Sequence, residues 1–213
     1  MEYENKELCS KCGGRCCKKG GCDYYVSDFK SIDKNTILKV LETGNVSIVS
    51  AFKYEMLTNG KKVVVPILYL RARNEGKKVI DLFSMKKRCS MLTSTGCSYN
   101  LEQRPGGGVN LIPNEKGCKP LNNPLDELKK WYPYQNLLAK IVKRYTGKTV
   151  DMVLKSDIEE VFYEVLSENF DGVDKLEIAD ILECLPNLVE CYPEEYIKAK
   201  NRKNNEIKLV RNK

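Results

Sequence analysis

Cysteine is the residue type whose number and spacing in this sequence could support chemistry. The chain of 213 residues contains ten cysteines and no histidine. Since no imidazole is available, we exclude Ser–His and Cys–His nucleophiles, His-ligated zinc hydrolases and iron sites of the two-His type. One short segment holds five of the cysteines: Cys9, Cys12, Cys16, Cys17 and Cys22. A later segment holds three more: Cys89, Cys97 and Cys118.

The spacing in the first segment is typical of a metal centre. The pairs Gly13-Gly14 and Gly20-Gly21 would let the backbone turn tightly around a metal. Interleaved lysine and arginine residues would offset the charge of several thiolates and lower the pKa of the thiols. A thiol–disulfide redox site and cysteines that are simply buried remain open as alternatives. Both zinc and iron–sulfur clusters accept four thiolates, so the ligand type does not determine which metal is bound.

Convergence of both cysteine segments on one centre is the simplest arrangement. Metal binding would then contribute directly to the free energy of folding. We expect four leading ligands: Cys9, Cys12, Cys17 and Cys97. We expect four further candidates: Cys16, Cys22, Cys89 and Cys118. Two separate four-thiolate sites are the alternative. Cys184 and Cys191 lie in apolar helical sequence, and we expect them in the core.

The second segment carries a resemblance to a known family. It reads Arg88-Cys89-Ser90-Met91-Leu92, then Gly96-Cys97-Ser98-Tyr99, then Arg104-Pro105. Together with Cys9-x2-Cys12-x3-Cys16-Cys17, this resembles the CxxCxxCC family of zinc- or iron-chelating proteins, over roughly residues 9–113. It is distantly similar to flagellin lysine-N-methylase. The resemblance implies an iron–sulfur cluster, with 4Fe–4S favoured, or zinc, and S-adenosylmethionine as a candidate cofactor.

The chain departs from the family pattern after Arg104-Pro105. Many relatives have a cysteine there, whereas this sequence has Gly106-Gly107-Gly108, and Cys118 could replace the missing ligand. Arg104, Gly106 and Gly107 are our candidate cofactor-binding residues, because backbone N–H groups of a glycine run can hold an anion. A tight turn that brings the following residues to the metal loop is the alternative for the glycines.

The expected fold class is α+β, with a small antiparallel β-meander, cysteine-rich metal-binding loops and a C-terminal helical region. Hydrophobic periodicity and turn residues predict a helix over 31–43, which Asp33 can cap, and strands over 46–54, 62–71 and 77–83. Pro66 predicts an edge strand or a bulge. A cysteine-bearing loop over 84–121 precedes three predicted helices. The first spans 125–145, with a bend at Pro133 and an end at Gly147, and the others span 156–169 and 175–184. We divide the chain into a metal-binding α+β region (1–122), a helical region packed on it (123–193) and a basic tail (194–213).

Composition and charge limit the remaining functional classes. The sequence has no apolar run of transmembrane length and a polar N-terminus, so we expect a cytoplasmic protein with no membrane partner. A net charge of +7 without aromatic residues interleaved among the basic ones does not favour nucleic-acid binding. The prediction is a cysteine-cluster protein that binds metal through thiolates from two loops, with a protein substrate or partner. Two alternatives are a metal-cluster-dependent enzyme, such as an S-adenosylmethionine-dependent protein lysine methylase, and a structural zinc module for protein interaction.

Overall fold

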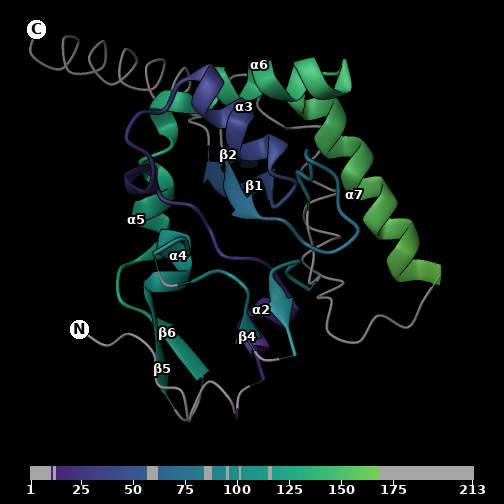
Figure 1. Ribbon diagram of the computed structural model, residues 1–213. Coiled ribbons are helices and arrows are strands. Elements are labelled where there is room, and N and C mark those ends of the chain that lie inside the picture. The colour runs from purple at the N-terminus through teal and green to yellow at the C-terminus, as the bar shows by residue number, and fades with distance from the viewer. Residues whose placement is uncertain are drawn as a thin grey trace, which may run out of the picture.

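A two-stranded antiparallel hairpin is the central element of the fold (Figure 1). Strand β1 (Val46–Met56) pairs with β2 (Lys62–Ala72) in a register that runs from Val46↔Ala72 to Met56↔Lys62. The computed structural model describes residue 11 and residues 13–56, 62–83, 88–94, 96–100, 102–114 and 117–167. Runs of β-branched and aromatic residues explain the strands. The expected α+β class is confirmed.

The prediction that residues 77–83 form the third strand of an antiparallel meander is wrong. Residues 79–82 lie beside β1 in the parallel direction, with bonds from Ile48 N to Val79 O (2.8 Å) and from Asp81 N to Ile48 O (2.9 Å). The free edge of β2 is already occupied, because Tyr24 N donates to Leu70 O and Ala72 N donates to Cys22 O. The chain after β2 therefore crosses to the other side of β1. Pro66 lies in β2, which pairs with no other strand than β1 among the described residues, as expected for an edge position.

Helices cover the hairpin. Helix α3 (Lys34–Glu42) begins after Asp33, whose carboxylate accepts from Thr36 N at 2.9 Å, as the sequence predicts. Helix α6 (Gln135–Thr146) and helix α7 (Val150–Ser167) follow later in the chain. The large side chains buried completely between these elements form the core: Ile37, Leu41, Ile48, Leu68, Leu70, Leu82, Trp131, Leu138, Ile141, Leu154 and Ile158.

The predicted helix over 125–145 is divided in three. Helix α5 (Pro124–Lys129) ends before the short 3-10 helix η2 (Tyr132–Tyr134), and α6 starts directly after it. Pro133 lies at the break, because proline has no N–H to donate within a helix. Helix α7 begins at Val150, earlier than the predicted 156–169. The predicted helix over 175–184, the basic tail, and Cys184 and Cys191 lie outside the described residues.

The predicted loop over 84–121 contains short regular elements. Strands β3 (Leu92–Thr93) and β4 (Gly96–Cys97) form one small hairpin, and β5 (Leu111–Asn114) and β6 (Gly117–Pro120) form another. One turn of helix, α4 (Gly106–Val109), precedes β5. Near the N-terminus lie helix α2 (Arg15–Lys19) and the 3-10 helix η1 (Val26–Asp28). Of these elements, α2, α4, β4, β5 and β6 lie in the lower half of Figure 1, below the central hairpin.

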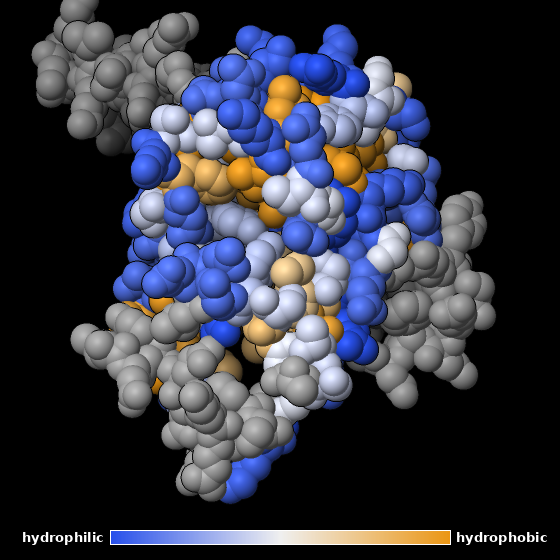
Figure 2. Space-filling model, viewed as in Figure 1, coloured by the Kyte–Doolittle hydropathy of each residue, from blue (hydrophilic) through white to orange (hydrophobic). Residues whose placement is uncertain are grey.

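Hydrophilic side chains dominate the face of the molecule in Figure 2. Apolar side chains are visible mainly in the upper part of this view, where α3 and α6 lie. Among the helices in the described part of the chain, none combines the length and the apolar character that crossing a membrane requires.

Candidate metal centre

Helix α2 carries the adjacent pair Cys16 and Cys17. Gly14 precedes it with a left-handed backbone (φ 72°), and its carbonyl accepts from Lys18 N at 2.9 Å. A side chain at Gly14 would be strained by this φ and would also meet Leu92 of β3, since a Cβ there would lie 2.6 Å from Leu92 Cδ1. Glycine is therefore required at position 14 for two reasons, the left-handed backbone and the close contact with Leu92.

The two cysteine segments are joined by a backbone hydrogen bond. Cys89 N donates to Cys17 O at 2.6 Å. Cys89 also forms an isolated antiparallel bridge with Asn74 and is buried. Cys97 lies on β4 opposite Leu92. Residues that are far apart in the sequence are thus held side by side, as the convergence hypothesis requires.

Cys22 is fixed against the end of β2. Its carbonyl accepts from Ala72 N at 2.8 Å, and the next residue, Asp23, forms an ion pair with Arg71 (Oδ1 to Nε 2.7 Å). Gly21 packs so closely that a Cβ would lie 2.0 Å from Ala72 O. The backbone therefore approaches β2 at this point only because residue 21 has no side chain.

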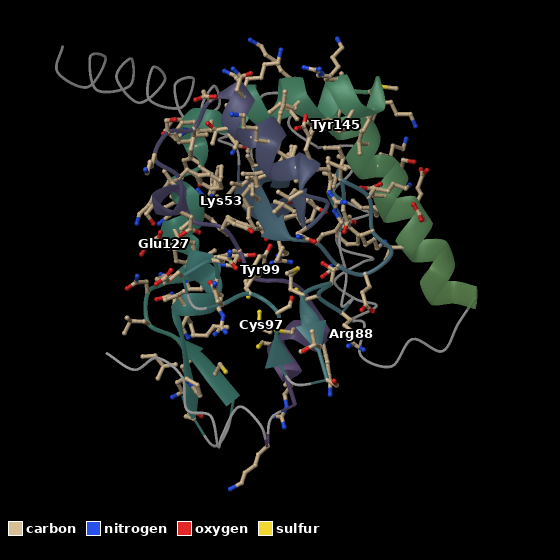
Figure 3. All side chains as sticks on the ribbon, in the orientation of Figure 1. Lys53, Arg88, Cys97, Tyr99, Glu127 and Tyr145 are labelled. Atoms are coloured by element: carbon tan, nitrogen blue, oxygen red, sulfur yellow. The ribbon has the colours of Figure 1, made fainter. Side chains whose placement is uncertain are left out.

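Five cysteines each influence at least one other member of the set, and we call this set the thiol cluster: Cys16, Cys17, Cys22, Cys89 and Cys97. The Sγ atoms of Cys16 and Cys17 are 3.9 Å apart. The electrostatic influence of Cys22 and Cys89 reaches Cys17, and that of Cys97 and Cys16 reaches Cys89. Figure 3 shows sulfur atoms gathered around Cys97, with Tyr99 beside them. The six described cysteines, Cys118 included, are present as thiols.

Crowding and burial raise the pKa of Cys16, Cys17 and Cys89, so these three thiols stay protonated when no cation is present. The hydrogen bond with Cys17 raises the pKa of Cys16. For Cys17, a hydrogen bond from Cys16 lowers the pKa, but the interaction with Cys22 and burial outweigh it and raise the pKa to about 12. Burial is the main cause of the raised pKa of Cys89. Several thiolates next to one another repel, so ionising the cluster requires a compensating positive charge.

Two tyrosines lie against the thiol cluster. The hydroxyls of Tyr24 and Tyr99 hydrogen-bond at 3.1 Å. Burial, followed by this hydrogen bond, raises the pKa of Tyr24, and Cys22 contributes to the shift. Burial raises the pKa of Tyr99, with contributions from Cys89 and Cys97. Both phenols are therefore neutral hydrogen-bonding groups beside the sulfurs.

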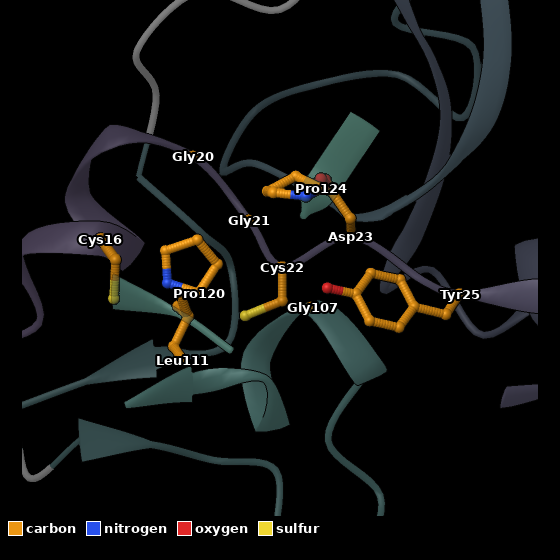
Figure 4. Close-up of a pocket in the computed structure, with 10 residues that line it drawn as sticks. All are labelled: Cys16, Gly20, Gly21, Cys22, Asp23, Tyr25, Gly107, Leu111, Pro120 and Pro124. Carbon is orange, nitrogen blue, oxygen red and sulfur yellow. The ribbon is translucent and has the colours of Figure 1, made fainter. Parts of the chain in front are cut away.

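A cavity of about 180 Å³ opens next to the cluster (Figure 4). Cys16 and Cys22 line it, and the hydroxyl of Tyr25 points toward Cys22. The other lining residues are Gly20, Gly21, Asp23, Gly107, Leu111, Pro120 and Pro124.

The structure brings together only part of the predicted ligand set. Cys9 and Cys12, two of the four leading candidates, lie outside the described residues. Cys118 lies on β6, in register with Pro113 of β5. Within the described ranges, no three cysteine, aspartate or glutamate side chains are arranged so that they could hold one metal ion. The cluster therefore offers soft sulfur donors of the right chemistry, but the described part alone is not a complete ion site.

The glycine run forms a tight turn against the first segment. Gly106 N donates to Asp28 Oδ2 at 2.8 Å, and Gly107 N donates to Asp23 O at 2.9 Å. A Cβ on Gly107 would lie 2.6 Å from that same carbonyl. These two N–H groups are thus engaged within the protein, as the tight-turn alternative requires.

Arg104 packs on Gly108, because a Cβ added at Gly108 would lie 3.0 Å from Arg104 Cγ. Cofactor binding by Arg104, Gly106 and Gly107 stays a prediction.

Sequence reasoning gave no role to Asp23, Arg71, Tyr24 and Tyr25. The run Cys22-Asp23-Tyr24-Tyr25 directly after the glycine pair was the available signal, since a charged residue and two phenols followed a candidate ligand. Their partners, Arg71 and Asn110, could not be identified without the fold.

Comparisons with family models, with curated proteins and with solved structures give no match to this chain.

Proposed function

We propose that this protein binds a metal centre, either an iron–sulfur cluster or zinc, through thiolates from its two cysteine segments. One observation carries the proposal: Cys89 N donates to Cys17 O at 2.6 Å, so the two cysteine segments lie side by side although they are far apart in the sequence. Cys16 and Cys17 each interact electrostatically with Cys89. The resemblance of both segments to the CxxCxxCC pattern supports the same function.

The donor set fits a thiophilic metal. Thiolates are soft ligands that bind zinc and iron–sulfur clusters, and there is no histidine to compete for the role. A bound cation would remove the cost of ionising the crowded thiols, and binding would release their protons. Cys9 and Cys12 are the candidates for the remaining positions, because they precede Cys16 at the spacing typical of a metal-binding loop.

The test is anaerobic purification of the full chain, followed by an absorption spectrum and metal analysis of one sample. Broad visible absorption with stoichiometric iron and sulfide would identify an iron–sulfur cluster. A colourless protein with stoichiometric zinc would identify a thiolate zinc site. A protein that retains neither metal, before or after anaerobic reconstitution, would overturn the proposal.

Substitutions locate the site. Cys17→Ser and Cys97→Ser each remove a donor from a different segment, so we expect both to lower metal content strongly. Ser98→Ala is a control next to Cys97; it removes only an exposed hydroxyl that donates to Met91 O. We expect this variant to retain full metal content. Equal metal content in all three variants would contradict binding at the thiol cluster.

A further inference from the structure

We propose that the cavity beside the thiol cluster is an open ligand position of the metal centre, and that it binds a small uncharged molecule carrying a thiol or thioether. This inference rests on the proposed function and deepens it. A closed structural metal site has every position filled by protein, whereas a site that exchanges ligands or reacts keeps one accessible. The cavity is the feature of this structure that distinguishes the two cases.

Two cysteines of the thiol cluster form part of the cavity wall. Cys16 and Cys22 are the two cluster residues that line it, and Cys16 is exposed. Figure 4 shows the Cys22 side chain directed into this space. A molecule in the cavity therefore places its own donor atom next to two protein sulfurs. Zinc and iron bound by thiolates also accept an exogenous sulfur ligand, because the softness of the donor suits the site.

Charge compensation in the walls favours an uncharged ligand. Asp23 is the one charged residue among those that line the cavity, and Arg71 already neutralises it at 2.7 Å. The ligand thiol can release its proton on binding, because the metal compensates the thiolate. A second charged group on the ligand would lose hydration on entry without gaining a counter-charge from the cavity walls. Leu111, Pro120 and Pro124 give the cavity an apolar side.

Tyr25 supplies a polar contact for the ligand. Its hydroxyl oxygen accepts from Asn110 Nδ2 at 2.9 Å, which leaves the phenolic proton to donate. The volume of about 180 Å³ is below the about 300–1,000 Å³ of pockets for drug-sized ligands. The ligand class is therefore a molecule of a few heavy atoms, with a sulfur donor at one end and a hydrogen-bond acceptor at the other.

The experiment uses the loaded full chain and two probes of similar length, 2-mercaptoethanol and 2-mercaptoethanesulfonate. If the centre is zinc, Co²⁺ replaces it and the sulfur-to-cobalt charge-transfer absorption is titrated. If it is an iron–sulfur cluster, the electron paramagnetic resonance spectrum of the reduced cluster is titrated. We expect 2-mercaptoethanol to change the spectrum, with an apparent Kd at least about tenfold lower than that of the sulfonate.

Two neighbouring positions on β5 provide matched variants. Leu111→Trp places a large side chain in the cavity, whereas Ile112→Trp places it at an exposed position that does not line the cavity. We expect Leu111→Trp to lose the response to 2-mercaptoethanol while it retains its metal, and Ile112→Trp to respond as the parent protein does. Pro120→Phe fills the cavity from the opposite strand and replaces Leu111→Trp if that variant does not fold.

The outcomes separate the two proposals. A loaded protein that shows no response to 2-mercaptoethanol, an equal response to the sulfonate, or an unchanged response after the cavity is filled would overturn the open-position inference alone. A protein that binds no metal would overturn the proposed function and, with it, this inference.

Discussion

Gln135 and Leu68 exchange two hydrogen bonds in the buried interior. Leu68 N donates to Gln135 Oε1 and Gln135 Nε2 donates to Leu68 O, both at 2.8 Å. The side-chain amide thus satisfies the edge of β2 as a neighbouring strand would. Gln135 Nε2 also donates to Trp131 O at 3.0 Å, and the residue is completely buried. This amide joins the first residue of α6 to the central hairpin.

Replacing Gln135 should cost considerable stability. Gln135→Ala leaves the N–H and C=O of Leu68 buried without these partners, and each unsatisfied group costs about 1–3 kcal/mol. We expect a loss of about 2–4 kcal/mol in the free energy of unfolding, measured by urea denaturation. Lys140→Ala, at an exposed position of the same helix, should change it by less than about 0.5 kcal/mol. A small effect at position 135 would mean that water replaces the amide.

The close approach of Gly21 to β2 predicts a coupled loss of stability and metal. A Cβ in Gly21→Ala would lie 2.0 Å from Ala72 O, so the chain before Cys22 must move away from the hairpin. We expect a loss of stability of more than about 2 kcal/mol, because backbone has to shift. We also expect reduced metal content, because Cys22 moves with it.

Gly76→Ala is the matched glycine control for this prediction. Gly76 has a φ of 71°, and a Cβ there would meet nothing within 4 Å. It should therefore lose only about 1 kcal/mol from backbone strain and keep its metal. Thermal unfolding and metal analysis of both variants test the contrast, and equal behaviour would show that the close approach at Gly21 is not limiting.

Removal of the metal should loosen the cysteine segments but leave the hairpin core folded. The main hydrophobic cluster is built mostly from β1, β2 and the helices and includes none of the five cysteines of the thiol cluster, although Cys89 is itself buried. Hydrogen exchange of the loaded and chelator-treated protein measures this directly. We expect protection to fall over residues 15–24 and 88–99, whereas α6 keeps its protection. Loss of protection throughout would instead mean that folding of the core depends on the metal.

The sequence predicted local features better than long-range ones. Asp33 as the start of α3, Pro66 on an edge strand, Pro133 as a break and Gly147 as the end of α6 all follow from preferences of single residues, and all are present. The parallel course of residues 79–82 beside β1 could not be predicted, because it depends on Tyr24 and Cys22 occupying the edge of β2.

The candidate site divides in the same way. The number and spacing of the cysteines predicted the candidate ligands. The order of the two segments suggested that they meet. The Cys89–Cys17 hydrogen bond, the Asp23–Arg71 ion pair and the cavity depend on how distant segments pack. No pattern in the sequence encodes such contacts, since each joins residues on separate elements.

Asp157 on α7 predicts a pH-dependent stability. Its carboxylate accepts from Leu82 N at 2.9 Å, but burial outweighs this bond and raises the pKa of Asp157 above its usual value. The folded state therefore binds a proton at Asp157 more tightly than the unfolded state does. It follows that the contribution of this residue to stability is greatest at low pH and falls as pH rises through the pKa of the folded state.

Asp157→Asn tests this directly, because the amide oxygen can still accept from Leu82 N without carrying a charge. We expect the variant to be more stable than the parent protein at pH 7, and the difference to shrink as the pH is lowered toward 3. Asp151→Asn changes an exposed carboxylate of the same helix and should give no such trend. Urea midpoints across the pH range provide the measurement. A variant less stable than the parent at pH 7 would show that the charged hydrogen bond to Leu82 outweighs the cost of burying the carboxylate.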